Sequence, residues 1–203
     1  SSGDTLAVGA HQEDGCGTTI INGASAYDTS NGCENAGAVY VYVRDGETWS
    51  AQAYIKAANA EAGDKFGSSL ALSGDTLAVG ARYEDGCGTS VVNGASGYST
   101  GNGCSNTGAA YVFTRSGGVW APQAYLKAAN AGNSDYFGYD VAITGDTIVV
   151  GAYGEDSCST SVINAASGYS SSNSCSNAGA AYVFTRSGSS WTPISPAQSI
   201  ASS

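Results

Sequence analysis

One sequence unit recurs along the chain with a constant period of 71 residues. The segment SGDTLAVGA at positions 2–10 returns unchanged at 73–81, and the related TGDTIVVGA follows at 144–152. Such fidelity, without insertion between copies, indicates repeated structural units. We therefore expect about three repeats of 71 residues, divided as residues 1–65, 66–136 and 137–203.

Composition favours strands and turns and excludes several classes of partner. The chain is rich in Gly, Tyr, Val and Thr, residues that are typical of turns and strands. Its seven Lys and Arg residues and formal net charge of −10 argue against nucleic acid and anionic membranes, which are bound chiefly by basic side chains. No apolar run approaches the roughly 18 residues that span a bilayer, so membrane insertion is not expected. The chain begins with Ser1 rather than Met, and we interpret it as a processed product or a piece of a longer protein.

Each repeat contains two cysteines with a spacing of 17. Because every repeat can form the same internal bridge, the expected disulfides are Cys16–Cys33, Cys87–Cys104 and Cys158–Cys175. A bridge closing a loop of this length stabilises by about 3 kcal/mol in the chain-entropy model, and it needs an oxidising compartment. The spacing therefore predicts an extracellular protein, secreted or on the cell surface. A zinc site is disfavoured, because the sequence has no CxxC motif and only one histidine, His11.

The strand pattern favours sheets that are packed on both faces. In GAVYVYVR at 37–44, Val39 and Val41 point to one face while Tyr40 and Tyr42 point to the other. Strands that are apolar on both faces belong to a sheet packed between neighbouring sheets. Radially stacked blades of four-stranded antiparallel sheet meet this requirement, whereas a two-sheet sandwich would leave one face of most strands polar. The expected fold is all-β, with β-propeller-like blades.

The order of the repeated elements also carries a family resemblance. FGSSLALSGDTLAVGA at 66–81 and FGYDVAITGDTIVVGA at 137–152 both place Phe-Gly, a short strand, a turn and a Val-Gly-Ala strand in succession. This order resembles the FG-GAP repeat of integrin alpha-subunit propellers and related bacterial surface proteins. The resemblance covers nearly the whole chain, and it implies a β-propeller with extracellular adhesive or scaffolding roles.

The calcium site of many such repeats is not carried over. That site is a D-x-D-x-D-G loop between two hairpin strands, in which alternate carboxylates converge on the cation. Here the connection is only Ser-Gly-Asp at 73–75 or Thr-Gly-Asp at 144–146, so no cofactor is expected. Glu-Asp pairs that recur after the Val-Gly-Ala strands are weak calcium candidates: Glu13, Asp14, Glu84, Asp85, Glu155 and Asp156. The alternative, which we favour, is a solvated acidic loop that caps the strand end.

No catalytic motif is evident, and the chain is expected not to be an enzyme. A Ser-His-Asp or Cys-His arrangement needs a histidine, and His11 has no recognisable partner. The P-loop and H-E-x-x-H motifs are missing from the sequence, so a hydrolase rests on analogy of fold alone. Asn-x-Cys patterns and hydroxyl-rich loops such as 167–173 fit a glycoprotein, although turn-forming loops explain them equally well.

The two ends of the sequence complement each other. The first repeat lacks the inner strand that begins with Phe-Gly, and Trp191 is followed by TPISPAQSIASS rather than a QAYLK-like strand. Residues 196–203 resemble a degenerate inner strand, which we expect to complete the first repeat of a neighbouring copy. The expected assembly residues are Ser199, Ile200 and Ala201 on the donated strand, and Thr5, Leu6 and Val8 on the receiving edge.

Two functional hypotheses follow. Three repeats fall below the four to eight blades usual for a propeller, which favours completion between molecules, as a ring or a filament. The first hypothesis is a non-catalytic extracellular structural or adhesive protein that polymerises with itself head to tail into a filament or surface layer. The alternative is a β-propeller module, part of a larger FG-GAP adhesin, that binds glycans or other extracellular proteins. In it, Tyr27, Tyr98 and Tyr169 would stack on sugars, although packing over the disulfide loop explains them too.

Overall fold

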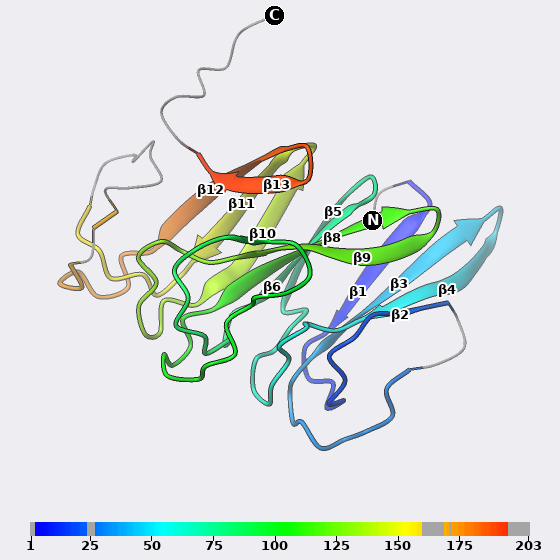
Figure 1. Cartoon of the computed structure of the whole chain (residues 1–203), viewed down its shortest axis with the longest axis horizontal. Helices are drawn as coiled ribbons and strands as arrows, with labels where there is room; N and C mark the ends of the chain where they lie inside the picture. The colour runs from blue at the N-terminus through cyan, green and yellow to red at the C-terminus, as the bar shows by residue number, and fades with distance from the viewer. Residues whose placement is uncertain (1–2, 24–26, 160–168, 171, 195–203) are drawn as a thin grey trace, which may run out of the picture.

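The computed structural model describes residues 3–23, 27–159, 169–170 and 172–194, which form three antiparallel sheets (Figure 1). The first sheet has the order β1-β3-β4-β2, with β1 (Thr5–Ala10), β2 (Ile21–Asn22), β3 (Ala38–Asp45) and β4 (Thr48–Ile55). The second has the order β5-β6-β8-β9-β7, with β5 (Ser69–Ser73), β6 (Thr76–Ala81), β7 (Val92–Asn93), β8 (Ala109–Ser116) and β9 (Val119–Leu126). The third has the order β10-β11-β12-β13, with β10 (Phe137–Thr144), β11 (Thr147–Ala152), β12 (Ala180–Ser187) and β13 (Ser190–Pro193). Within these ranges no helix is long and apolar enough to cross a membrane.

Equivalent strands of the three sheets pair in the same register. The Val-Gly-Ala strands β1, β6 and β11 are offset by 71 residues, and each is antiparallel to the next long strand. In the register, Val8 lies opposite Tyr40, Val79 opposite Tyr111 and Val150 opposite Tyr182. The sequence period is therefore a structural period, and the predicted all-β fold of propeller-like blades is confirmed.

The second and third sheets each have an inner strand that precedes the Val-Gly-Ala strand. β5 pairs with β6 and β10 pairs with β11 through two-residue turns, in which Gly74 and Gly145 take positive φ angles of 56° and 52°. Glycine suits these positions because side chains disfavour that conformation. The first sheet has no such strand among the described residues, so β1 forms its edge.

The apolar core lies between the sheets, in two layers. One layer joins the first and second sheets, and the other joins the second and third. All six residues of β6 are buried, because the second sheet is packed on both faces. In the first sheet only one face is packed: Val39 and Val41 are buried, whereas Tyr40 and Tyr42 are half-buried. Burial on both faces, predicted for every blade, therefore holds for the middle one.

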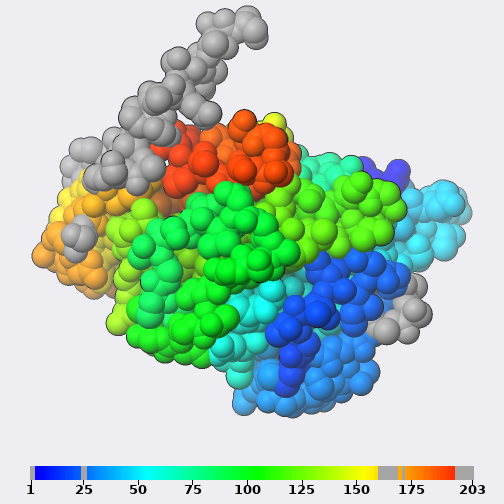
Figure 2. Space-filling view, in the orientation of Figure 1, coloured from blue at the N-terminus to red at the C-terminus, as the bar shows by residue number. Residues whose placement is uncertain are grey.

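The three sheets stack in sequence order. The first sheet, blue to cyan, and the third, yellow to red, lie at opposite ends with the second between them (Figures 1 and 2). The stack consequently has two outer faces, one on the first sheet and one on the third.

Candidate functional site

Each disulfide closes a loop within a single repeat. The pairs are Cys16–Cys33, Cys87–Cys104 and Cys158–Cys175, which are the pairs expected from the spacing. Every bridge lies beside a backbone hydrogen bond from the second cysteine to the Asp of the Glu-Asp pair, as in Cys33 N to Asp14 O at 2.9 Å. The bridge and this bond fix the loop that follows the Val-Gly-Ala strand.

The glutamates of the Glu-Asp pairs have structural partners. Lys127 donates to Glu84 over 2.9 Å, and their side chains are 0% and 3% exposed. Lys56 forms the equivalent pair with Glu13 at 3.0 Å. Burial lowers the pKa of Lys127, and the carboxylate of Glu84 opposes this shift. These side chains pin the loop onto the last long strand of the same sheet.

In the third repeat the glutamate has another partner. Glu155 is buried and accepts bonds from the backbone and hydroxyl of Ser157. The expectation of a solvated acidic loop is therefore wrong for Glu84 and Glu155, because both carboxylates are buried and hydrogen-bonded.

The aspartates of the pairs bind backbone amides. Asp14, Asp85 and Asp156 each accept a hydrogen bond from the backbone N–H of an asparagine 21 residues later. Across the described ranges no three His, Cys, Asp or Glu side chains gather in a way that could hold a metal ion. The six carboxylates proposed as weak calcium candidates thus serve as anchors of the loop in the described structure.

The tyrosines of the disulfide loops pack on strand tyrosines of their own sheets. Tyr98 stacks on Tyr125 with ring centroids 5.1 Å apart. Tyr27 lies 5.4 Å from Tyr40, and the Tyr169 ring makes an equivalent contact in the third repeat. Packing over the loop thus engages each of the rings that were considered for sugar stacking, and Tyr27 remains 39% exposed. His11 lies in the turn after β1.

Consecutive sheets meet at a repeated junction, which is centred on a buried tryptophan. Trp120 Nε1 donates to Gln52 Oε1 of the preceding sheet at 2.8 Å, and Trp191 Nε1 donates to Gln123 Oε1 at 2.7 Å. Both indoles are at most 1% exposed. A buried donor of this kind needs an acceptor, and the glutamine supplies it.

Arginine and asparagine complete each junction. Arg115 Nη1 lies 2.9 Å from Thr5 Oγ1 and 3.0 Å from Gln52 Oε1 of the preceding sheet. The Asn22 side chain forms two bonds with the backbone of Trp120, at 2.8 and 3.1 Å. The same bonds recur 71 residues later: Arg186 with Thr76 and Gln123, and Asn93 with Trp191. We call the surface with Trp and Arg the donor face, and the surface with Gln, Asn and Thr the acceptor face.

The Phe-Gly segment enters the acceptor face of the preceding sheet. Phe66 forms an isolated parallel bridge with Gly37, and its N–H donates to Ala36 O at 3.0 Å. Phe137 repeats both contacts with Gly108 and Thr107. Each junction therefore combines an apolar layer, a bound Phe-Gly segment and a set of side-chain hydrogen bonds between Trp and Arg on one sheet and Gln, Asn and Thr on the other. We call this set of bonds the polar latch.

The outer face of the first sheet is an open donor face. Trp49 is 45% exposed, although its equivalents Trp120 and Trp191 are buried. Val8 is 43% exposed on the same face, and Leu6 is half-buried. Thr5, which also belongs to the predicted receiving edge, points to the opposite face, toward the second sheet. It is buried there and accepts the hydrogen bond from Arg115. The residues expected on the donated C-terminal strand, Ser199, Ile200 and Ala201, lie outside the described residues, as does the rest of 196–203.

The outer face of the third sheet is an open acceptor face with one substitution. Thr147 of β11 occupies the position of Thr5 and Thr76, but Ile194 occupies the position of Gln52 and Gln123. This face therefore lacks the glutamine side-chain oxygen Oε1, which accepts the indole and guanidinium hydrogen bonds at the internal junctions.

Sequence reasoning missed the polar latch. Gln52 and Gln123, like Asn22 and Asn93, lie one period apart, so the signal was present. A polar residue within or beside a strand usually faces solvent, however, and the pattern alone does not say which sheet lies opposite. The replacement of this glutamine by Ile194 in the third repeat was also visible in the sequence. Its importance could not be recognised, because the sequence does not show that a tryptophan lies opposite this position.

Two buried aspartates in the connections between sheets have perturbed acidity. Burial raises the pKa of Asp64 to about 8 and that of Asp135 to about 6. Each carboxylate accepts a backbone bond from three residues earlier, from Glu61 at 2.9 Å and Gly132 at 2.6 Å. These groups stabilise the turn that leads into the Phe-Gly segment, and they contact no candidate catalytic group.

Comparisons with known proteins agree with this architecture. The FG-GAP repeat model matches residues 49–113 and 120–184, more than half of the chain. Each match begins at the tryptophan of one sheet and ends within β8 or β12 of the next, so it spans one junction. A comparison with curated proteins found no match.

These matches carry general expectations about the type of protein. FG-GAP repeats suggest an extracellular β-propeller-type adhesive module and are typically non-enzymatic. Together with three disulfides, they are typical of extracellular proteins. The extent of the match, together with the repeated sheets of the structure, shows that the chain belongs to the FG-GAP repeat family.

Proposed function

We propose that this protein is a non-catalytic extracellular structural or adhesive protein that assembles head to tail, through strand complementation, into a filament or surface layer. One observation carries the proposal: the stack ends in an open donor face and an open acceptor face. These faces are the repeat equivalents of the two surfaces that join at each internal junction.

The donor face supplies the apolar part of the proposed contact. Leu77, Val79 and Trp120 are buried where the second sheet meets the first. Their equivalents Leu6, Val8 and Trp49 are half-buried or exposed on the first sheet. Covering a large aromatic in a well-packed contact contributes strongly to association, so Trp49 is the residue on which assembly would depend most.

The substitution at Ile194 makes a second contribution necessary. A contact between copies would place Trp49 against Ile194 rather than a glutamine, and it would lack the bonds that Gln52 and Gln123 accept. Each lost bond to a buried donor costs on the order of 1 to 3 kcal/mol. Strand complementation offsets this loss in the proposal: residues 196–203 of one copy add main-chain bonds to the free edge of β1 in the next.

Light scattering on a truncated protein tests this proposal. Removal of residues 196–203 should leave a folded monomer that no longer polymerises, whereas the intact chain forms larger species. Ile200→Asp should act in the same way, because it places an unpaired charge at the large apolar position of the inserted strand. Ser203→Asp is the matched control that should still assemble, because in an extended strand it falls on the face opposite Ile200. Assembly of the truncated protein to the same size as the intact chain would refute strand donation.

The alternative function is a glycan- or protein-binding module, and one surface feature favours it. Tyr139 and Tyr153 stack with ring centroids 5.2 Å apart and are 45% and 60% exposed on the third sheet. Exposed aromatic rings suit sugar or protein contacts. A monodisperse monomer whose saturable binding to a glycan panel is lost in Tyr153→Ala would favour this function over assembly.

A further inference from the structure

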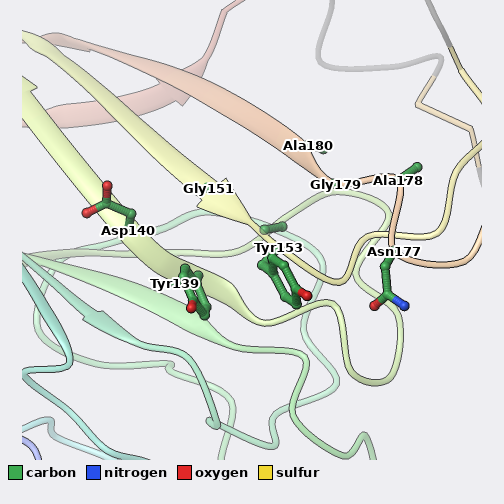
Figure 3. A pocket seen from close by; sticks show the side chains of 9 residues that line it. Tyr139, Asp140, Gly151, Tyr153, Asn177, Ala178, Gly179 and Ala180 are labelled. Carbon is green, nitrogen blue, oxygen red and sulfur yellow. The ribbon is translucent and has the colours of Figure 1, made fainter.

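A groove opens on the acceptor face of the third sheet (Figure 3). Its volume is about 340 Å³, and it lies beside the exposed Tyr139–Tyr153 pair between β11 and the loop that leads into β12. Its lining combines these tyrosines with small residues, which leave the backbone accessible: Asp140, Gly151, Ala152, Asn177, Ala178, Gly179 and Ala180.

Grooves made by equivalent residues are filled at both internal junctions. In the first sheet, the carbonyls of Asn35 and Ala36 each accept a bond at 3.0 Å, from the backbones of Lys65 and Phe66. Gly37 then pairs with Phe66 in a parallel bridge. Two periods later, these three positions are Asn177, Ala178 and Gly179. The same filling occurs at the next junction, where Tyr136 and Phe137 bond to Asn106 and Thr107.

The empty groove keeps the backbone conformation of the filled ones. Asn177 and Gly179 have φ angles of 54° and 73°, close to the 56° and 84° of Asn35 and Gly37. Among the described residues, no backbone N–H bonds to the carbonyls of Asn177 and Ala178. The acceptors are therefore oriented before any segment is bound, which lowers the ordering cost of binding.

We propose that this groove is a docking site for an extended aromatic-Gly segment, of the Phe-Gly type, from an FG-GAP blade outside these 203 residues. The two Phe-Gly segments of this chain, 66–67 and 137–138, are already seated in their own grooves. A folded second copy consequently has none to offer. The partner differs from that of the strand donation described above, but both would lie on the acceptor face of the third sheet, so the segment would dock only where no second copy is joined there.

The filled grooves define what the segment must be. Its second residue must be glycine, because Gly67 and Gly138 have φ angles of 87° and 85°. A Cβ on Gly67 would also lie 2.7 Å from Ala38 O. The residue before it must be large and apolar, because Phe66 and Phe137 are fully buried in the layers between sheets.

One glycine distinguishes a filled groove from the empty one. A Cβ on Gly9 would clash with the carbonyl oxygen of Gly67, and a Cβ on Gly80 with that of Gly138. At the equivalent Gly151 the nearest atom to such a Cβ is Asp140 O, at 3.8 Å. Gly151→Ala therefore fits the isolated chain but would block a docked segment.

The test is an NMR titration of the full-length Ile200→Asp chain, which is expected not to polymerise, with the capped hexapeptide SDYFGY, which reproduces residues 134–139. Saturable shifts are expected around Gly151 and Gly179, with a dissociation constant of about 1 mM or lower. In Gly151→Ala the affinity should fall at least about tenfold. The control Val149→Ala changes an exposed residue beside the groove to the alanine found at Ala78, and it should bind normally.

A second peptide, SDYFVY, tests the requirement for glycine, and it should not bind. The proposal is overturned if SDYFGY causes no shift at about 2 mM, if its shifts fall on β1 instead, or if Gly151→Ala binds as well as the parent protein. Failure of the tail truncation to prevent polymerisation would refute strand donation without affecting these outcomes.

Discussion

Lys127→Met is expected to destabilise the second repeat severely, because it removes one partner of a buried ion pair. Lys127 Nζ lies within 2.9 Å of four oxygens: Glu84 Oε2, Gly86 O, Gly108 O and Thr107 Oγ1. The side chain is fully buried and that of Glu84 is 3% exposed. Methionine fills a similar volume but leaves the carboxylate without its counter-charge.

The size of the effect follows from this burial. Removing one partner of a buried pair costs roughly 3 to 5 kcal/mol, because the remaining charge stays desolvated. Lys56→Met should cost less than Lys127→Met, since the Glu13 side chain is 15% exposed and water can solvate it. The double variant Lys127→Met, Glu84→Gln should recover part of the loss, because a neutral amide is cheaper to bury than a carboxylate.

Urea unfolding followed by tryptophan fluorescence measures these differences, since Trp120 is buried at the junction of the first and second sheets. Loss of less than about 1 kcal/mol in Lys127→Met would refute the reasoning, because it would place the pair in the range of surface ion pairs. An equal loss in the single and double variants would show that the missing ammonium bonds, rather than the stranded carboxylate, dominate.

Three further predictions concern the junctions, the acidity of a buried carboxyl and metal independence. Gly80→Ala should lower the free energy of unfolding by about 1 to 3 kcal/mol, because the added methyl group would clash with the backbone of Gly138. Gly151→Ala should cause no such loss, and equal melting temperatures of the two variants would contradict the assigned junction. Asp64→Asn should flatten the pH dependence of stability. The pKa of Asp64 is about 8 in the folded protein, above its ordinary 3.8, so the folded state binds this proton more tightly than the unfolded state. The parent protein therefore loses stability as the pH rises from about 4 to 8. A parent protein with a rising stability over that window would contradict this assignment. Chelation by EDTA should leave the melting temperature unchanged, because Lys127 and backbone N–H groups already hold Glu84 and its neighbouring aspartate; a clear fall would reveal a metal site in the loops.

Sequence reasoning predicted the repeated architecture well, because period and composition act locally in every copy. The spacing of Cys16 and Cys33, repeated twice, was enough to pair the cysteines. The alternation of Val and Tyr in 37–44 was enough to indicate two apolar faces, although only the middle sheet is covered on both.

Contacts between sheets could not be predicted in the same way. Gln52 and Trp120 are 68 residues apart, and nothing local in either segment indicates that one accepts a bond from the other. The Glu-Asp pairs failed for a related reason: Lys56 lies 43 residues after Glu13, so the local pattern resembled an exposed acidic loop. Long-range pairing of polar groups depends on how the sheets stack, which the period alone leaves open.

The placement of the disulfides determines how the molecule would respond to mechanical tension. Each bridge closes a loop inside one repeat, with a separation of 17 residues, and none crosses a junction. A pulling force along the chain therefore meets only non-covalent resistance between sheets. Each closed loop shortens the fully stretched chain by about 50 to 55 Å, the length of 17 extended residues less the 5.1 Å between the bridged Cα atoms. Under load, whole sheets would separate at their junctions while their loops stayed shut, and a reductant would lengthen the fully stretched chain by that amount in every repeat.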